Sequence, residues 1–278
     1  MAQQQLNRLN THHTIRWEEG RSFSIPEDDI SPESPLAIRL IAGINNRRKT
    51  HELAITMRTD GQDEELVIGY LFAEGIIGQA KQITSMRLLD ANNIEVHLHP
   101  SIQFSADQHQ KNSYSNSACG LCSKTSLDQL DQTSCYFPTP GTPFVEPIIL
   151  NKLSKILYQQ QSLFKLTGGM HAAALFSQKG ELLLSREDVG RHNAMDKLLG
   201  ASLRQGLMPW RDKIVFLSSR LSFELVQKAA MAGTPILAAI GAPSTLAIKM
   251  AEQSGMSMIG FLRNDRFNVY TYPERVNL

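Results

Sequence analysis

Residues 213–262, KIVFLSSRLSFELVQKAAMAGTPILAAIGAPSTLAIKMAEQSGMSMIGFL, decide the fold class. Short apolar runs alternate there with longer segments whose apolar residues recur at helical spacing. The predicted strands are Lys213–Leu217, Pro235–Ile240 and Met256–Leu262, and the predicted helices are Ser222–Ala232 and Pro243–Gln253. Apolar strands that alternate with helices are typical of a largely parallel sheet covered by helices. The sequence therefore predicts an α/β domain.

The alternation of strands and helices is less regular in the parts of the chain nearer the N-terminus. The larger domain also includes predicted helices Ile148–Gln160 and Arg191–Leu203 and strands His171–Ser177 and Glu181–Ser185. A smaller α+β unit is predicted from strands Leu36–Ala42, Glu52–Arg58, Ile83–Leu89 and Ile94–Leu98 and from helix Asp63–Gly75. We expect frayed chain over the first dozen residues and a loop around Pro26, Pro32 and Pro35.

A polar segment separates these two units. Residues 99–118 are rich in Ser, Gln and Asn and show no period, which is typical of a flexible loop. We therefore expect an N-terminal α+β subdomain at 14–112, a mobile loop and linker at 113–144, and the larger domain at 145–278. The first 144 residues carry a net charge of −5 and the remainder +6. This split is compatible with two regions that have different partners, and equally with chance scatter of surface charge.

Composition narrows the protein class. The chain has 278 residues, of which 42% are hydrophobic and 20% charged, so a disordered chain is excluded. No apolar run is long enough to span a membrane. The polar start, MAQQQLNRLNTHHT, does not resemble an export signal. Three cysteines without such a signal favour a reducing, cytoplasmic location.

The segment Cys119-Gly120-Leu121-Cys122 is the densest chemical signal. A structural zinc site would need four ligands, and the chain has no second Cys-x-x-Cys. A zinc deaminase would need His-x-Glu and Pro-Cys-x-x-Cys, but Ala118 stands at the proline position and His-x-Glu does not occur. A thioredoxin-like pair should open a helix after a strand, whereas this pair follows a predicted loop.

The remaining interpretation is a cysteine that relays sulfur. A thiolate on a polar tether can attack a persulfide, keep the terminal sulfur and move to an acceptor. The alternative is an ordinary loop with two unreactive thiols. Cysteines are more often buried, however, so two of them together on a polar loop call for a functional explanation. Cys135 lacks such a context and is expected to be structural or incidental.

Polar residues gather at the predicted strand ends. They comprise Gly168–Gly169, the run Ser185–Asn193 (SREDVGRHN), Ser218–Arg220 and Gly241–Ser244. Strand ends of an open α/β sheet line the crevice where ligands bind. The glycine pair is also compatible with an ordinary turn, and the charged run with a solvated helix start. Convergence of several such junctions favours a binding site more than any one of them.

Phe261-Leu262-Arg263-Asn264-Asp265-Arg266 follows the last predicted parallel strand. The two arginines could bind phosphates through forked hydrogen bonds. Asn264 or Asp265 could accept hydrogen bonds from the edge of a guanine base. A charged surface loop explains the same residues equally well.

Taken in order, these motifs resemble the formate dehydrogenase accessory sulfurtransferases, the FdhD family. The shared features are Cys-Gly-x-Cys, Thr-Gly-Gly-x-His, Glu-Asp-Val-Gly-Arg-His-Asn, Ser-Ser-Arg and Phe-x-Arg. The resemblance implies a larger domain similar to cytidine deaminases. It also implies a carrier that takes sulfur from a cysteine desulfurase and passes it to the molybdenum cofactor of a formate dehydrogenase.

The resemblance also assigns residues. Cys119 would carry the persulfide and Cys122 would support it, while Phe261, Leu262, Arg263, Asn264, Asp265 and Arg266 would bind the cofactor in its bis(molybdopterin guanine dinucleotide) form. His171, Arg191 and Asn193 match further motif positions. We expect no structural metal, no nucleic acid and no membrane partner, but a second copy of the chain is conceivable. The competing class is a cofactor-binding chaperone that transfers no sulfur itself.

Overall fold

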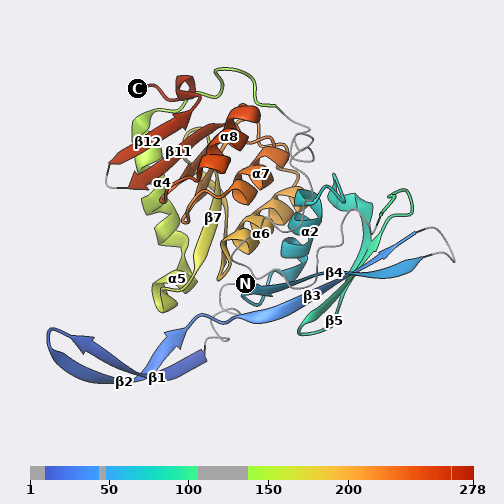
Figure 1. Ribbon diagram of the computed structural model, residues 1–278, viewed down its shortest axis with the longest axis horizontal. Helices are drawn as coiled ribbons and strands as arrows, with labels where there is room; N and C mark the ends of the chain where they lie inside the picture. The colour runs from blue at the N-terminus through green and yellow to red at the C-terminus, as the bar shows by residue number, and fades with distance from the viewer. Residues whose placement is uncertain (1–9, 44–47, 106–136, 264) are drawn as a thin grey trace.

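A mixed six-stranded sheet forms the centre of the larger unit (Figure 1). The computed structural model describes residues 10–43, 48–105, 137–263 and 265–278. The strand order is β12-β11-β10-β9-β7-β8. The strands are β7 (His171–Ser177), β8 (Leu182–Asp188), β9 (Lys213–Leu217), β10 (Ile236–Ala239), β11 (Ser257–Arg263) and β12 (Arg266–Thr271).

The α/β class is confirmed, but the expectation of a largely parallel sheet is wrong in detail. Only the pairs β9–β10 and β10–β11 are parallel. β7 is antiparallel to β8 and β9, and β12 is antiparallel to β11. Short turns join β7 to β8 and β11 to β12, and a tight turn can join only antiparallel neighbours. The direction of β7 against β9 depends instead on which strands become neighbours after folding.

Helices cover both faces of this sheet. Alternate residues of its strands share one apolar core with α6 (Arg191–Arg204), α7 (Phe223–Met231) and α8 (Thr245–Gln253). The residues between them pack against α4 (Pro147–Gln160), which the short helix α5 (Ser162–Thr167) follows. The result is a three-layer α/β/α arrangement. The predicted similarity to cytidine deaminases stays a prediction.

The N-terminal unit is a four-stranded sheet with one long helix. The strand order is β4-β3-β6-β5, and the elements are β3 (Ser34–Ala42), β4 (Lys49–Arg58), β5 (Ile83–Asp90), β6 (Asn93–Leu98), α2 (Asp63–Ala73) and the short η2 (Ala80–Gln82). The inner face of β3 is apolar at every second residue, as expected for a half-buried strand. Its core is continuous with that of α6, α7 and α8.

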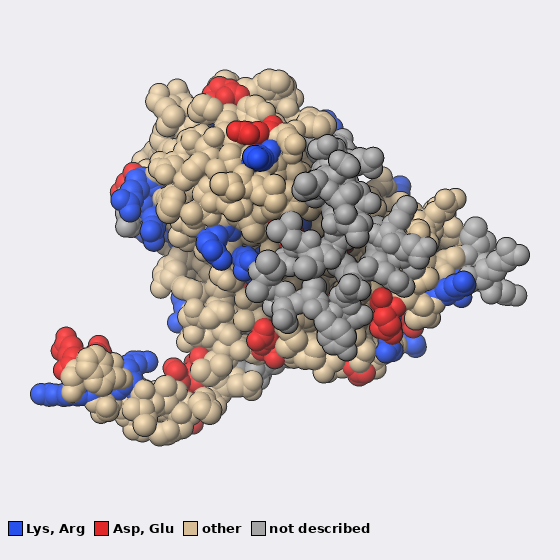
Figure 2. All heavy atoms as spheres, in the orientation of Figure 1, with Lys and Arg blue, Asp and Glu red and all other residues tan. Residues whose placement is uncertain are grey.

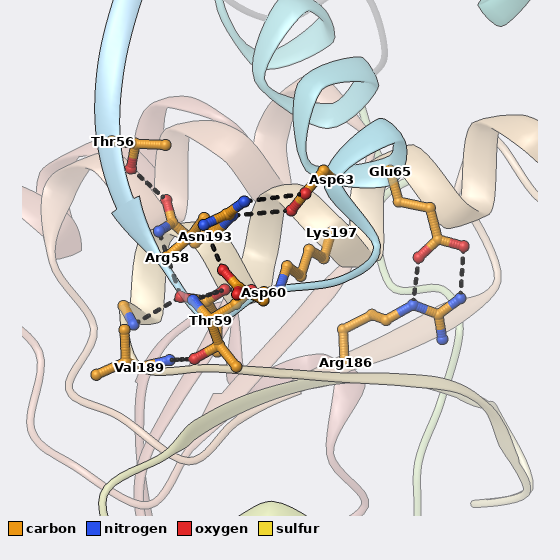
Figure 3. Close-up of polar contacts among 12 residues, drawn as sticks. Thr56, Arg58, Thr59, Asp60, Asp63, Glu65, Arg186, Val189, Asn193 and Lys197 are labelled. Atoms are coloured by element: carbon orange, nitrogen blue, oxygen red, sulfur yellow. Dashed lines mark hydrogen bonds and ion pairs between the residues drawn. The ribbon is translucent and has the colours of Figure 1, made fainter. Parts of the chain in front are cut away.

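Two glycines allow the two units to pack closely. A Cβ atom on Gly69 of α2 would overlap the backbone of Asp196 in α6, and one on Gly200 of α6 would overlap the backbone of Glu65 in α2. The helices therefore touch backbone to backbone, which only glycine permits. Glu65 also forms a forked ion pair with Arg186 of β8, with 2.6 and 2.9 Å bonds (Figure 3).

Two elements contradict the sequence-based expectations. The region expected to be frayed chain and loop contains a hairpin, β1 (Asn10–Glu18) and β2 (Arg21–Ile30), that extends away from the body (Figure 1). Its turn, Glu19-Gly20, has positive φ at both residues, as twisted two-residue hairpins require. Because most residues of these strands are exposed, the sequence lacks the alternation that marks a half-buried strand.

β12 is the second of these elements, because the sequence predicts no strand after Met256–Leu262; a charged surface loop is only one of the two interpretations of residues 261–266. Most of the predicted linker, residues 113–136, lies outside the described residues. No described helix has the length and apolarity needed to cross a membrane.

Candidate functional site

One edge of the six-stranded sheet collects most of the predicted site residues. The carboxyl ends of β9, β10 and β11 lie there because these strands are parallel. His171 pairs with Asp188 and Ala173 with Leu217, so the start of β7 and the end of β8 lie at the same edge. The predicted convergence of the polar junctions is therefore present, although β7 runs against its neighbours.

The junctions at this edge are stacked through their backbones. Gly241 donates from its N–H to the carbonyl of Ser219 at 3.1 Å, and Phe261 donates to the carbonyl of Gly241 at 3.2 Å. A Cβ atom on Gly241 would come within 2.8 Å of Arg220 Cα, so this position must be glycine. Phe261 has φ +55°, a left-handed conformation that is rare for a bulky residue. Strained backbone at one edge is common at binding sites.

Two arginines face each other beyond β11. Arg263 ends β11 and Arg266 begins β12, and the two form a cross-strand pair. Both are exposed, and Asp265 between them has φ +56°. Basic side chains gather over this end of the β11–β12 hairpin in Figure 2. Two guanidinium groups so placed repel each other unless an anion lies between them, which favours phosphate binding.

His171 and Arg191 form the inner part of the edge. Burial lowers the pKa of His171, Arg191 lowers it further, and Asp188 opposes both effects. The imidazole is therefore mainly neutral at pH 7. The Nε atom of Arg191 is buried and has no hydrogen-bond partner in the described part of the chain. A buried guanidinium nitrogen without an acceptor is compatible with an anionic ligand at this place.

Asn193 has a different environment from the other predicted ligands. Its Oδ1 accepts from Thr56 Oγ1 at 3.0 Å, and its Nδ2 donates to the carbonyl of Met57 at 2.6 Å (Figure 3). Nδ2 also lies 3.3 Å from Asp188 Oδ1. The amide thus joins β4 to the first turn of α6, and its polar atoms are occupied by protein partners.

The acidic pair that precedes this helix is also structural. Glu187 accepts hydrogen bonds from the backbone N–H groups of Leu163 and Phe164, at 3.1 and 2.9 Å, and so caps α5 from outside. Burial raises the pKa of Glu187, whereas these N–H donors lower it. Because α5 leads directly into the glycine turn before His171, Glu187 helps to fix the start of β7.

Asp188 anchors the turn from β8 into α6. Lys197 donates to the carbonyl of Thr59 at 2.9 Å while pairing with Asp188, and Gly190 N–H donates to Asp188 Oδ1 at 2.9 Å. Val189 N–H donates to Thr59 Oγ1 at 3.0 Å (Figure 3). The residues of the run 185–193 therefore have two different roles. Glu187, Asp188 and Asn193 stabilise the fold, whereas Arg191 and His192 lie at the edge of the sheet where the predicted site residues gather.

Sequence reasoning missed one pair at this edge, His192 and Glu224. They begin different helices, α6 and α7, so no spacing signal connects them. Cys119, Cys122 and Cys135 lie outside the described residues, as does Asn264. Among the residues that the structure describes, no three His, Cys, Asp or Glu side chains are grouped as metal ligands would be.

Comparison with known proteins gives a consistent result. A model of the FdhD/NarQ family matches residues 33–277. The sulfur carrier protein FdhD of Streptomyces avermitilis is 42% identical over 275 residues, which cover 95% of this chain and 94% of that protein. The protein of the same name from Sulfurisphaera tokodaii is 38% identical over 253 residues, with 91% and 93% covered.

A solved structure shares the fold. It is the crystal structure of a candidate formate dehydrogenase accessory protein from Desulfotalea psychrophila. The TM-score is 0.73 at 23% identity, over 96% of this chain and 99% of that one. At this level of identity the likeness describes architecture alone.

Proposed function

The chain belongs to the FdhD/NarQ family, and from this premise we propose that it is a sulfur carrier for a formate dehydrogenase. Its relatives named sulfur carrier protein FdhD cover nearly the whole chain. The structural observation that carries the proposal is the convergence of His171, Arg191 and the Arg263–Arg266 pair at one sheet edge. Such an edge suits an anionic cofactor that receives sulfur.

In this proposal sulfur travels as a cysteine persulfide. The thiolate of Cys119 attacks the terminal sulfur of a persulfide on a cysteine desulfurase, and the desulfurase cysteine leaves as a thiolate. Cys122 supports Cys119 as a neighbouring thiol. The sequence context, two cysteines within a long polar segment, supports these roles. The reaction requires reduced thiols, so we place the protein in the cytoplasm.

The acceptor is the molybdenum cofactor in its bis(molybdopterin guanine dinucleotide) form, bound as a substrate. The segment Phe261–Arg266 would hold its guanine dinucleotide portion, with Arg263 and Arg266 on phosphate oxygens. His171 and Arg191 would contact the same ligand deeper along the edge. Asn193 would act indirectly, by fixing the turn that presents Arg191, because its own amide is already hydrogen-bonded.

The projecting hairpin supports a further part of the proposal, a homodimer. Ile15 and Trp17 on β1 are 70% and 71% exposed, and an isolated two-stranded hairpin is marginally stable in water. A second copy of the chain would cover these side chains. Measurement of the solution mass for the wild type and Trp17→Ser would test this, since loss of the apolar contact should shift the protein toward monomer.

Activation of formate dehydrogenase distinguishes a sulfur carrier from a cofactor chaperone. The test compares the wild type with Cys119→Ala and Cys135→Ala in maturation of the catalytic subunit. A sulfur carrier predicts that Cys119→Ala gives inactive enzyme and that Cys135→Ala gives active enzyme. Full activation by Cys119→Ala would overturn the carrier mechanism and favour the chaperone.

A further inference from the structure

Thr59 lies at the junction of the two units, directly after strand β4. The residue is only 1% exposed. Its hydroxyl accepts a hydrogen bond from the N–H of Val189 at 3.0 Å (Figure 3). The same hydroxyl donates to the carbonyl of Pro32 at 3.2 Å. Because a hydroxyl has a single proton to donate, this side chain joins two segments that lie far apart in the sequence.

The backbone of Thr59 is held separately from its hydroxyl. Its N–H donates to Asp188 Oδ2 at 3.1 Å, and its carbonyl accepts from Lys197 Nζ at 2.9 Å. Neither bond involves the side chain of Thr59, so both can persist when the hydroxyl is removed. The hydroxyl is therefore a restraint that can be tested apart from the junction of the two units.

The first segment bonded to this hydroxyl presents Arg191. Val189 lies between Asp188, the last residue of β8, and Gly190, which directly precedes α6. Arg191 begins that helix, and its buried Nε has no hydrogen-bond partner in the described part of the chain. The bond from Val189 N–H to Thr59 therefore restrains the turn directly before this guanidinium group.

The hydroxyl also contacts the residue before His171. The sulfur of the buried Met170 lies 3.8 Å from Thr59 Oγ1. A thioether is only a weak acceptor, so this contact is mainly packing. It places Thr59 behind the start of β7, the strand that His171 begins.

Pro32 connects the hydroxyl to the glycine turn before β7. Beside Pro32, the hydroxyl of Ser31 donates to Thr167 Oγ1 at 2.7 Å. A Cβ atom on Gly169 would overlap the Ser31 hydroxyl, so glycine is required for this close approach. The bond between Thr59 and Pro32 therefore restrains the segment against which the turn packs.

We propose that Thr59 is a positioning residue for the sheet edge that holds His171 and Arg191. The inference rests on the proposed function, in which this edge binds the guanine dinucleotide portion of the cofactor. Thr59 acts through its neighbours and not on the ligand. Its hydroxyl holds the turn before Arg191 and the segment behind the start of β7, so both side chains keep their places before the ligand arrives. Groups that are already in place lower the cost of binding.

Removal of the hydroxyl alone tests this role. Valine has the branched shape of threonine but no hydrogen-bonding group in its side chain, whereas serine keeps the hydroxyl. Calorimetry with guanosine diphosphate compares the full-length wild type, Thr59→Val and Thr59→Ser. Thr59→Val should bind about 5-fold more weakly, the equivalent of one ordinary hydrogen bond. Thr59→Ser should bind like the wild type.

Thr271 supplies the matched control. Its buried hydroxyl accepts from the N–H of Met258 at 2.8 Å and donates to the carbonyl of Met256 at 2.6 Å. The bonding pattern is that of Thr59, but Met256 directly precedes β11 and so lies at the opposite end of that strand from Arg263. Thr271→Val should therefore lower the melting temperature without weakening the binding of guanosine diphosphate.

The possible results separate this inference from the proposed function. Wild-type protein that does not bind guanosine diphosphate would overturn the proposed cofactor site and this inference with it. Wild-type binding together with unchanged affinity in Thr59→Val would overturn only the role of Thr59. Equal weakening in Thr59→Val and Thr271→Val would also overturn that role, because a general loss of stability would then explain both.

Melting temperatures show which variants fold. If Thr59→Val does not fold, Thr59→Cys decides in its place, because a thiol forms only weak hydrogen bonds. Its binding of guanosine diphosphate should be weaker than that of Thr59→Ser. Equal affinity of these two variants would then overturn the positioning role.

Discussion

Lys197 Nζ lies 2.7 Å from Asp188 Oδ2, and neither side chain has any exposed surface. The pair closes the turn from β8 into α6, and Thr59 of the N-terminal unit is hydrogen-bonded to both partners. Figure 3 shows the network of polar contacts around Thr59 and Lys197. A buried carboxylate that loses its cation is strongly destabilising. This contact therefore fixes both the junction of the two units and the first turn of α6, which carries Arg191 and His192.

Removal of the lysine charge should lower stability sharply. In Lys197→Met the Asp188 carboxylate stays buried without its partner, and we expect the free energy of unfolding to fall by about 3–5 kcal/mol in urea denaturation. The double variant Lys197→Met/Asp188→Asn should be less destabilised than the single one, because no unpaired charge remains. Equal losses in the two proteins would show that packing, and not charge pairing, dominates this site.

Gly200 should tolerate no side chain. Gly200→Ala would force α6 away from the backbone of Glu65, and overpacking of this kind costs about 3 kcal/mol. Gly78→Ala is the control, because a Cβ atom there meets only the end of the Gln82 side chain at 3.7 Å. Thermal unfolding should show a much lower melting temperature for Gly200→Ala than for Gly78→Ala. Similar melting temperatures would contradict the close helix crossing.

The facing arginines should bind guanosine diphosphate. Arg263→Ala and Arg266→Ala should each weaken binding about 10-fold in calorimetry, since a hydrogen bond to a charged group contributes about 1.5–3 kcal/mol. Added salt should weaken wild-type binding as well. Arg87→Ala is the control, because Arg87 is 72% exposed on β5 in the other sheet. Unchanged affinity in both edge variants would exclude this hairpin as the phosphate site.

His171 should make stability depend on pH. Its pKa in the folded protein is lower than the ordinary 6.5, through burial and then through Arg191. The unfolded chain therefore binds more protons below that pH, so this contribution is fully present above 6.5 and is lost as the pH falls. His171→Gln should flatten the stability curve on the acidic side. An equally steep acidic limb in His171→Gln would refute the depressed pKa.

The sequence predicts the parts of the fold that bury a regular apolar pattern. Strand Lys213–Leu217 has the predicted bounds, because a short apolar run between polar segments is typical of a buried strand. The β1–β2 hairpin was missed because its strands bury neither face and so lack a period. The antiparallel direction of β7 relative to β9 could not be predicted from the sequence either, since it depends on which strands become neighbours after folding.

In the candidate site, too, some residues are predicted from the sequence and others are brought together only by folding. Contiguous motifs revealed the edge formed by His171, Arg191 and Arg263, because each motif follows or precedes a strand. The structural role of Asn193 was hidden, since its partners Thr56 and Met57 belong to the other unit. His192 and Glu224 were also hidden, because only the packing of α6 beside α7 brings them together.

The central claim is that this chain carries sulfur on Cys119. The most direct measurement is intact mass after incubation with a cysteine desulfurase and cysteine, for the wild type and for Cys119→Ala, Cys122→Ala and Cys135→Ala. The account predicts one added sulfur, removable by a reductant, in the wild type and Cys135→Ala, and none in Cys119→Ala. Undiminished loading of Cys119→Ala, with loss only in Cys122→Ala or Cys135→Ala, would contradict it.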